Sequence, residues 1–123
     1  MRDEAWIWEQ IKDDRLQNML RELSELLCQV YGSKLKAVIL YGSVARGTQT
    51  EGSDIDIMVL VDGDDDVLRS FWDKLSDVST EMALKYLEVF SIIDVSYQEY
   101  NDWKMVSPFY RNVSEEGVVL YAA

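Results

Sequence analysis

Two apolar segments, LKAVILYG at residues 35–42 and DIDIMVLV at residues 54–61, constrain the fold more than any other feature of the sequence. Both are short and rich in aliphatic and β-branched residues, which is typical of strands buried in a sheet. A glycine-containing loop, residues 42–53, joins them. The second segment begins with Asp54 and Asp56, although a buried carboxylate is costly unless it is paired or binds a metal. The sequence therefore predicts two core strands and a special role for the two acids.

The apolar residues before and after these strands recur at helical spacing. A stripe over residues 16–30 predicts an amphipathic helix that ends at Gly32, and a second stripe predicts a helix from Val67 to about Tyr86. The acidic turn DGDDD precedes this second helix, and Asp66 is its expected cap.

A third strand is predicted at EVFSIIDVS, residues 88–96, followed by a short helix with Ser96 as its cap and Glu99 in the capping-box position. The last residues, SPFYRNVSEEGVVLYAA, predict a turn or helical piece, then Gly117 and a brief apolar tail. The order helix, strand, strand, helix, strand indicates an α/β sandwich, in which helices pack on a small mixed sheet.

Length and composition exclude several classes of protein. The chain has 123 residues, of which 48% are hydrophobic, so one domain with a compact core is expected. No apolar run is long enough to span a membrane, and the acidic N-terminus lacks the apolar core of a secretion signal. Cys28 is the one cysteine, so no internal disulfide can form. We therefore expect a cytoplasmic protein.

The charge of the chain is strongly acidic. Twelve basic and 23 acidic residues give a net charge of −11, and there is no histidine. The absence of histidine excludes serine–histidine and cysteine–histidine catalysis and histidine-ligated zinc. Because phosphate backbones are repelled by an acidic surface, direct nucleic-acid binding is not expected. A basic protein partner is favoured instead.

Asp54 and Asp56 are spaced for one face of a strand, together with Met58, because side chains alternate along a strand. Two adjacent carboxylates repel each other, and a divalent cation between them removes that penalty. Oxygen ligands favour Mg²⁺ or Mn²⁺, and magnesium commonly bridges to substrate phosphates. The alternative interpretation is a solvated face of an edge strand, with the isoleucines turned inward.

The loop before these acids has the residues of a phosphate site. Gly42 and Gly47 let the backbone approach an anion, Ser43 can donate its hydroxyl, and Arg46 can hold a phosphate through charge-assisted bonds. Ser53, next to Asp54, is a further candidate nucleotide-binding residue. A phosphate cradle and a metal pair on adjacent strands indicate a nucleotide as the ligand.

The segment GSVARGTQTEGSDIDIMVLV resembles the signature of the DNA polymerase β-like nucleotidyltransferase superfamily, and most closely its minimal nucleotidyltransferase branch. The resemblance implies the nucleotidyltransferase fold and transfer of a nucleoside monophosphate from a triphosphate with the help of two metals. It assigns triphosphate binding to Gly42 and Ser43 and metal ligation to Asp54 and Asp56. It also implies one domain over residues 1–123, with an N-terminal helical part (1–34) and a catalytic core (35–123).

The superfamily also uses a third carboxylate, on a later strand, as a metal ligand or as the base for the acceptor hydroxyl. Asp94 in FSIIDVS is the candidate, predicted to share a face with Ile92 and Ser96. The alternative is a strand-end aspartate without a catalytic role. Glu88, at the start of the strand, is a poorer substitute.

Similar minimal nucleotidyltransferases are partnered with small helical HEPN proteins, which are RNase toxins. The resemblance thus implies an antitoxin that adenylylates a tyrosine of such a toxin, and the −11 charge suits a basic partner. Two alternatives stay open. One is a transferase for a small hydroxyl compound such as an aminoglycoside, with a site completed by homodimerisation. The other is an antitoxin that neutralises its partner by binding alone.

Two further patterns have simpler interpretations. Asp62, Asp64 and Asp66 share the spacing of a calcium-binding EF-hand loop, but the required glycine and glutamate are missing, so a solvated acidic turn is predicted. The tryptophans are expected in the core or at interfaces, and Trp6 and Trp8 are candidates for a partner contact.

Overall fold

The structure is a computed structural model that describes residue 11 and residues 13–123. Trp6 and Trp8, the candidates for a partner contact, lie outside these residues. The elements follow in the order α2 (Asp14–Tyr31), the 3-10 turn η1 (Gly32–Lys34), β1 (Leu35–Tyr41), α3 (Gly42–Arg46), β2 (Ile55–Val61), α4 (Asp65–Tyr86), β3 (Phe90–Ser96), α5 (Tyr97–Trp103), α6 (Pro108–Glu116) and β4 (Val118–Ala122).

The four strands form one mixed sheet with the order β3-β2-β1-β4. β1 pairs antiparallel with β2 and with β4, whereas β2 and β3 are parallel. A parallel pair needs a crossover connection, and α4 provides it. The apolar tail is thus a fourth strand at the edge of the sheet, which the sequence had indicated only as a brief apolar segment.

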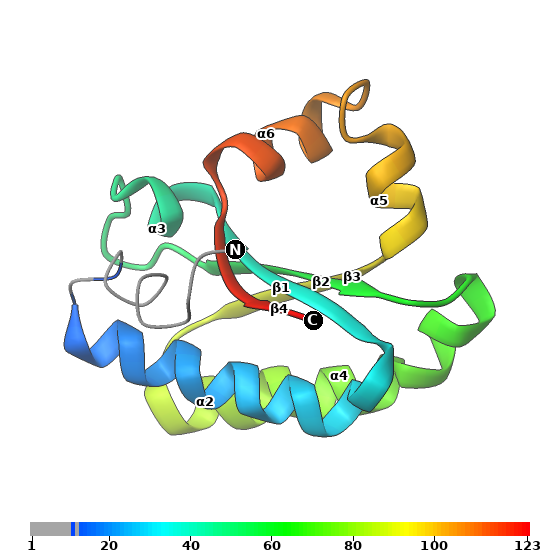
Figure 1. The fold of residues 1–123 in the computed structure, drawn as a ribbon. Helices are drawn as coiled ribbons and strands as arrows, with labels where there is room; N and C mark the ends of the chain where they lie inside the picture. The colour runs from blue at the N-terminus through cyan, green and yellow to red at the C-terminus, as the bar shows by residue number, and fades with distance from the viewer. Residues whose placement is uncertain (1–10, 12) are drawn as a thin grey trace.

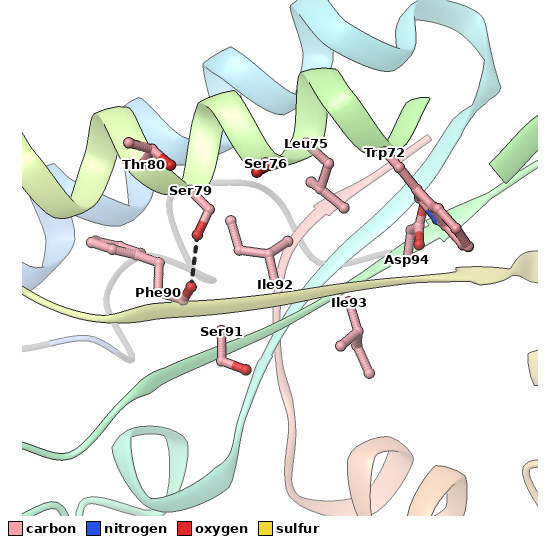
Figure 2. Close-up of a pocket in the computed structure, with 10 residues that line it drawn as sticks. All are labelled: Trp72, Leu75, Ser76, Ser79, Thr80, Phe90, Ser91, Ile92, Ile93 and Asp94. Atoms are coloured by element: carbon pink, nitrogen blue, oxygen red, sulfur yellow. Dashed lines mark hydrogen bonds between the residues drawn. The ribbon is translucent and has the colours of Figure 1, made fainter. Parts of the chain in front are cut away.

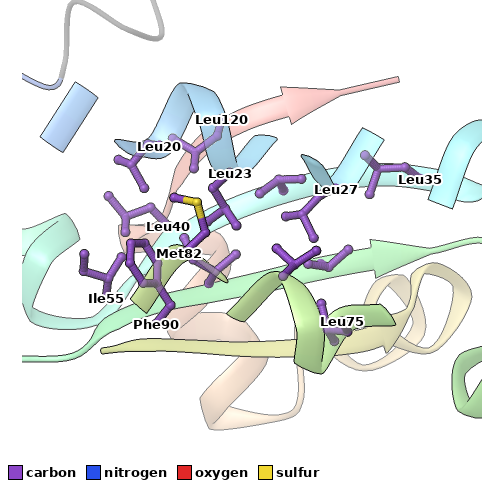
Figure 3. Close-up of a cluster of buried hydrophobic side chains, with 14 of the residues drawn as sticks. Leu20, Leu23, Leu27, Leu35, Leu40, Ile55, Leu75, Met82, Phe90 and Leu120 are labelled. Atoms are coloured by element: carbon purple, nitrogen blue, oxygen red, sulfur yellow. The ribbon is translucent and has the colours of Figure 1, made fainter. Parts of the chain in front are cut away.

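The helices cover the two faces of the sheet unequally (Figure 1). The long helices α2 and α4 pack side by side on one face, and α3, α5 and α6 lie on the other. Alternate strand residues therefore enter different cores. Ile57 and Val59 join the larger core under α2 and α4, which Figure 3 shows, while Met58 and Leu60 join the smaller core under α5 and α6. This alternation decides which acids of β2 and β3 can meet.

The predicted ends of α2 and α4 and the predicted start of α5 are confirmed, with α4 ending at Tyr86. Gly32 ends α2 with a φ of 58°, and the hydroxyl of Ser96 accepts a hydrogen bond from the Glu99 N–H at the start of α5. The expectation that Asp66 caps α4 is wrong. Asp64 is the cap, since its carboxylate accepts a hydrogen bond from the Val67 N–H, and Asp66 lies inside the first turn, paired with Arg69. Acidic side chains are favourable throughout a first turn, so α4 begins earlier than its apolar stripe.

No helix among the described residues has both the length and the apolar character needed to cross a membrane.

Candidate nucleotide and metal site

The candidate site lies where β1 ends and β2 begins. The antiparallel register places Tyr41 opposite Asp56, so that Gly42, the next residue, meets the Asp56 side chain. Gly42 has a φ of 75°, and a β carbon there would collide with Oδ2 of Asp56. Both the backbone conformation and the close approach therefore require glycine at this position. Asp54 is exposed and directly precedes β2, which begins at Ile55.

The electrostatics of the site disfavour charge on Asp56. Burial raises the pKa of the half-buried Asp56 carboxyl, the neighbouring Asp54 carboxylate raises it further, and the Arg46 guanidinium lowers it. The pKa of Tyr41 is raised as well, first by burial and then by Asp56. A cation placed between the two aspartates would favour their charged forms and remove this repulsion.

The connection from β1 to β2 is partly helical. The sequence indicated a loop over residues 42–53, but its first five residues form α3, which ends at Gly47 in the left-handed conformation with a φ of 73°. This helix holds Gly42 and Ser43 beside the start of β2. Arg46 ends the helix, and its guanidinium forms an ion pair with Glu116 of α6 at 3.3 Å, with both side chains about half exposed.

Ser53 shapes the connection just before the acids. Its hydroxyl accepts a hydrogen bond from the Thr50 N–H at 3.0 Å, and its own N–H donates to the Thr50 carbonyl at 3.0 Å. These bonds close a tight turn that precedes Asp54. The structure thus brings Gly42, Ser43 and Arg46 together with the two aspartates at the end of β1, with Ser53 in the supporting turn.

Asp94 does not join this group, so its assignment as the third carboxylate is wrong. The parallel register pairs Asp94 with Val59, whose side chain enters the core under α2 and α4, whereas Asp56 shares the opposite face with Met58. The predicted face of Asp94 along its own strand is right. The error lies in the register between β2 and β3, which a sequence does not reveal.

Asp94 instead lies between β3 and the two long helices. The Tyr31 hydroxyl of α2 donates to Asp94 Oδ2 at 3.4 Å, and Figure 2 shows the indole of Trp72 from α4 beside the carboxylate. Burial raises the pKa of Asp94, while hydrogen bonds from its own backbone N–H and from the Tyr31 and Trp72 side chains lower it. Asp94 therefore connects three elements of the fold.

Ser91 occupies the position where a third carboxylate would have met the pair. It is the β3 residue in register with Asp56, and its side chain points away from α4, onto the Asp56 face (Figure 2). The substitute candidate Glu88 does not meet the pair in this structure, because it forms an ion pair with Arg15 of α2 at 3.0 Å. Among the described residues, no cluster of three or more acids or cysteines suits a metal.

The fold and this site define a protein of the nucleotidyltransferase class. Residues 20–117 match the family described as "Nucleotidyltransferase domain", which covers most of the chain. The chain belongs to this family and is a nucleotidyltransferase.

Curated relatives come from the archaeon Methanocaldococcus jannaschii. One, named "Putative protein adenylyltransferase MJ0604", is 40% identical over 102 residues, which are 83% of this chain and 94% of the relative. Another, named "Putative protein adenylyltransferase MJ1379", is 49% identical over 47 residues, which are 38% of this chain and 45% of the relative.

Solved structures share the fold. A crystal structure of a toxin-antitoxin with AMP-PNP matches with a TM-score of 0.53 and 23% identity, over 86% of this chain and 73% of the other. A mutant of the MntA-HepT toxin-antitoxin matches with a TM-score of 0.55 and 20% identity, over 85% and 73%. These likenesses confirm the nucleotidyltransferase fold expected from the sequence.

Proposed function

We propose that this chain transfers AMP from ATP to a hydroxyl of a partner protein, and that it acts as the antitoxin of a helical HEPN-type toxin modified on a tyrosine. The observation that carries the proposal is the close approach of Gly42, at the end of β1, to the Asp56 carboxylate, with the Asp54 carboxylate near enough to raise the pKa of Asp56. The name of the relative that spans most of the chain supports protein as the acceptor, and the toxin-antitoxin structures support the setting.

Each residue of the site has a role in this proposal. Gly42 and Ser43 bind the triphosphate through the backbone and a hydroxyl. Asp54 and Asp56 hold Mg²⁺ or Mn²⁺, which supplies charge neutralisation for the transferred phosphoryl group when it is bound. Arg46 exchanges its exposed ion pair with Glu116 for a phosphate oxygen. Ser53 keeps the turn that presents Asp54.

The residues present fit one nucleotide-borne cation better than two. Magnesium is commonly bound through one or two carboxylates and the substrate phosphates, which Asp54 and Asp56 can provide. With Ser91 beside Asp56, the described residues offer no third acid to a second cation. We infer that the proton of the acceptor hydroxyl is taken by the partner or by solvent.

The proposal includes the whole chain and its setting. Helix α2 and the catalytic core act as one domain, because Leu20, Leu23 and Leu27 of α2 share the larger core with the strands. The net charge of −11 suits a basic toxin rather than nucleic acid or a membrane surface, and we place the pair in the cytoplasm. The chain can also form a homo-oligomer in this setting.

The test is incubation of the purified chain with a candidate helical HEPN-type protein, ATP and Mg²⁺, followed by mass spectrometry of that protein. We expect a gain of one or more AMP units on a tyrosine, abolished by EDTA and by the double variant Asp54→Asn/Asp56→Asn. An unmodified toxin, in the presence of a correctly folded chain, would contradict the transfer.

A second candidate function is neutralisation by binding alone, and Ser91 is the observation that favours it. A site with two acids can retain nucleotide binding while it loses the chemical step. In that case the Asp54→Asn/Asp56→Asn variant would still neutralise the toxin in a growth assay. In the transfer mechanism, the same variant would fail.

A further inference from the structure

One edge of the sheet is open in the described part of the chain. β3 is the last strand of the order β3-β2-β1-β4, and no described strand pairs with its outer side. The Ile55 N–H donates to the Val89 carbonyl at 2.8 Å. This bond identifies which residues of β3 direct their backbone groups toward β2. In such a ladder, alternate residues turn both backbone groups to the same neighbour. Ser91 and Ile93 therefore face β2, and the N–H and C=O of Ile92 point outward.

A groove lies on each side of this open edge. The first, of about 600 Å³, lies between β3 and α4 and is lined by Ser76, Ser79, Thr80 and Asp94, with Trp72 at one end (Figure 2). The second, of about 410 Å³, lies between β3 and the pair α5 and α6, and has a more aromatic lining. Trp103, Phe109 and Tyr110 contribute its rings, and Glu99 contributes a carboxylate.

The edge is only partly protected against strand pairing. The Ser79 hydroxyl of α4 donates to the Phe90 carbonyl at 2.9 Å, and the Asp94 carboxylate accepts from its own backbone N–H, while the outward N–H and C=O of Ile92, between them, pair with no described strand. Other common protections are absent from β3. Exposed edges are commonly short, bulged, or marked by lysine or proline. β3 has the sequence FSIIDVS over seven residues, pairs with β2 in unbroken register, and contains no lysine or proline. Trp72 and Trp103, one at each groove, are both 55% exposed. A regular open strand with large exposed rings on both sides is typical of a binding surface.

We propose that an extended basic segment of a partner protein pairs with β3 and becomes a fifth strand of the sheet. A basic segment is favoured because the charged side chains that line the grooves are the acids Asp94 and Glu99. A second copy of this chain would bring another net charge of −11 to the same acids.

The two grooves also specify a pattern for the segment. Residues of an added strand alternate between the two faces. Those above the α4 groove meet hydroxyls and Asp94, which suits lysine or arginine. Those above the α5/α6 groove meet Trp103 and Phe109, which suits aliphatic or aromatic side chains. The segment is thus an alternation of basic and apolar residues. This surface does not use Asp54 or Asp56, so the proposal stands independently of nucleotidyl transfer.

The probe is a short synthetic peptide in which lysine alternates with valine, measured by fluorescence anisotropy. Two control peptides have the same charge. One groups the lysines at one end, and the other carries N-methyl groups on the backbone amides that would pair with β3. We expect the alternating peptide to bind at least about tenfold more tightly than either control, because each control loses backbone pairing or groove contacts. Equal binding of all three peptides would show attraction to an acidic surface alone and would overturn the proposal, as would no binding.

Amide hydrogen exchange by NMR locates the contact. On peptide binding, exchange of the Ile92 N–H should slow, whereas the Ser91 and Ile93 amides, already paired with β2, should change little. Asp94→Asn should weaken binding several-fold, because Asp94 is the acid that the lysines meet above the α4 groove, and the charge-removing control Glu25→Gln, at an exposed position of α2, should not. Asp54→Asn/Asp56→Asn should bind the peptide normally, which separates this surface from the nucleotide site. Protection of Ile92 without peptide, in a chain that sediments as a dimer, would assign the edge to a second copy and contradict the proposal.

Discussion

Asp56 and Asp94 lie on neighbouring strands, are both half-buried, and both have a pKa raised by burial, yet they face opposite sides of the sheet. Asp94 is offered hydrogen bonds by Tyr31 and Trp72. Asp56 has no such donor among the described residues. Its neighbours are the like charge of Asp54, the backbone of Gly42 and the Arg46 guanidinium, whose lowering of the pKa is outweighed by burial and Asp54. Asp94 receives its hydrogen bonds from other elements of the fold and therefore connects those elements. Asp56 lies beside a second carboxylate and therefore needs a bound cation to be stable in its charged form.

The largest expected effect comes from removing both acids of the site. Asp54→Asn/Asp56→Asn should reduce AMP transfer by about 10³-fold or more, because the charge that holds the cation at the phosphates is lost. Calorimetry should show that ATP binding no longer depends on Mg²⁺. The fold should be retained, since the variant also removes the repulsion that raises the pKa of Asp56. Undiminished transfer would place the chemistry elsewhere.

The next largest effect is expected from placing a third acid beside Asp56, on the face of the sheet that Asp94 does not reach. Ser91→Asp adds a carboxylate in register with Asp56, on the face that Asp94 does not reach. We expect a second Mn²⁺ to bind per AMP-PNP, measured by electron paramagnetic resonance. Transfer should rise by up to about 10²-fold where a missing base limits the rate.

The matched control is Ile93→Asp, one pair further along the same face, beside Met58. It adds the same charge away from the pair and should bind no second cation. A Ser91→Asp variant with unchanged Mn²⁺ stoichiometry would contradict the assignment of Ser91 to the third position.

Gly42→Ala should affect the site less than the changes to the acids themselves. Its β carbon would push the Asp56 carboxylate aside, and we expect nucleotide affinity in Mg²⁺ to fall by about 10–100-fold, as for other groups that orient metal ligands. Gly32→Ala at the end of α2 is the control, because Gly32 also has a positive φ, of 58°, but has no atom near its β carbon and no place in the site. It should cost roughly 1–2 kcal/mol of stability and leave affinity unchanged. Equal affinities of the two variants would show that the contact with Asp56 is unimportant.

Much of this arrangement could be predicted from local sequence. The apolar runs at 35–42 and 54–61 indicated β1 and β2, and the spacing of the apolar residues indicated α2 and α4. The approach of Gly42 to Asp56 followed from a short connection between adjacent strands. These features depend on neighbours in the chain.

The features that the sequence did not reveal depend on partners far along the chain. The register of β3 against β2 joins residues separated by the whole of α4. A shift of one residue would have placed Asp94 on the face of Asp56 and Ser91 on the opposite face. In the same way, VVLYA showed only an apolar tail until its pairing with β1 made it β4. The donors to Asp94 come from two helices, so its structural role had no signal in FSIIDVS.

The smallest effect on activity is expected at Asp94, where substitution should change the stability of the fold and not the rate of transfer. Asp94→Asn should transfer AMP within about twofold of the wild-type rate, because the residue faces away from the site. Asp94→Leu should also leave transfer unchanged but lower the free energy of unfolding by about 1–3 kcal/mol, since the Tyr31 hydroxyl loses its acceptor.

The pH dependence distinguishes this structural role from a passive one. Burial raises the pKa of Asp94 in the folded state, so between the usual aspartate pKa and this raised pKa the folded chain is protonated at Asp94 to a greater extent than the unfolded chain. The stability that Asp94 contributes is therefore greatest below the usual aspartate pKa and is lost as pH rises through the raised pKa. Asp94→Asn has no such proton, so urea unfolding should show it gaining stability relative to wild type between acidic and neutral pH. A constant difference across this range, or a large loss of transfer, would contradict the role of Asp94 as an acid that the fold itself accommodates.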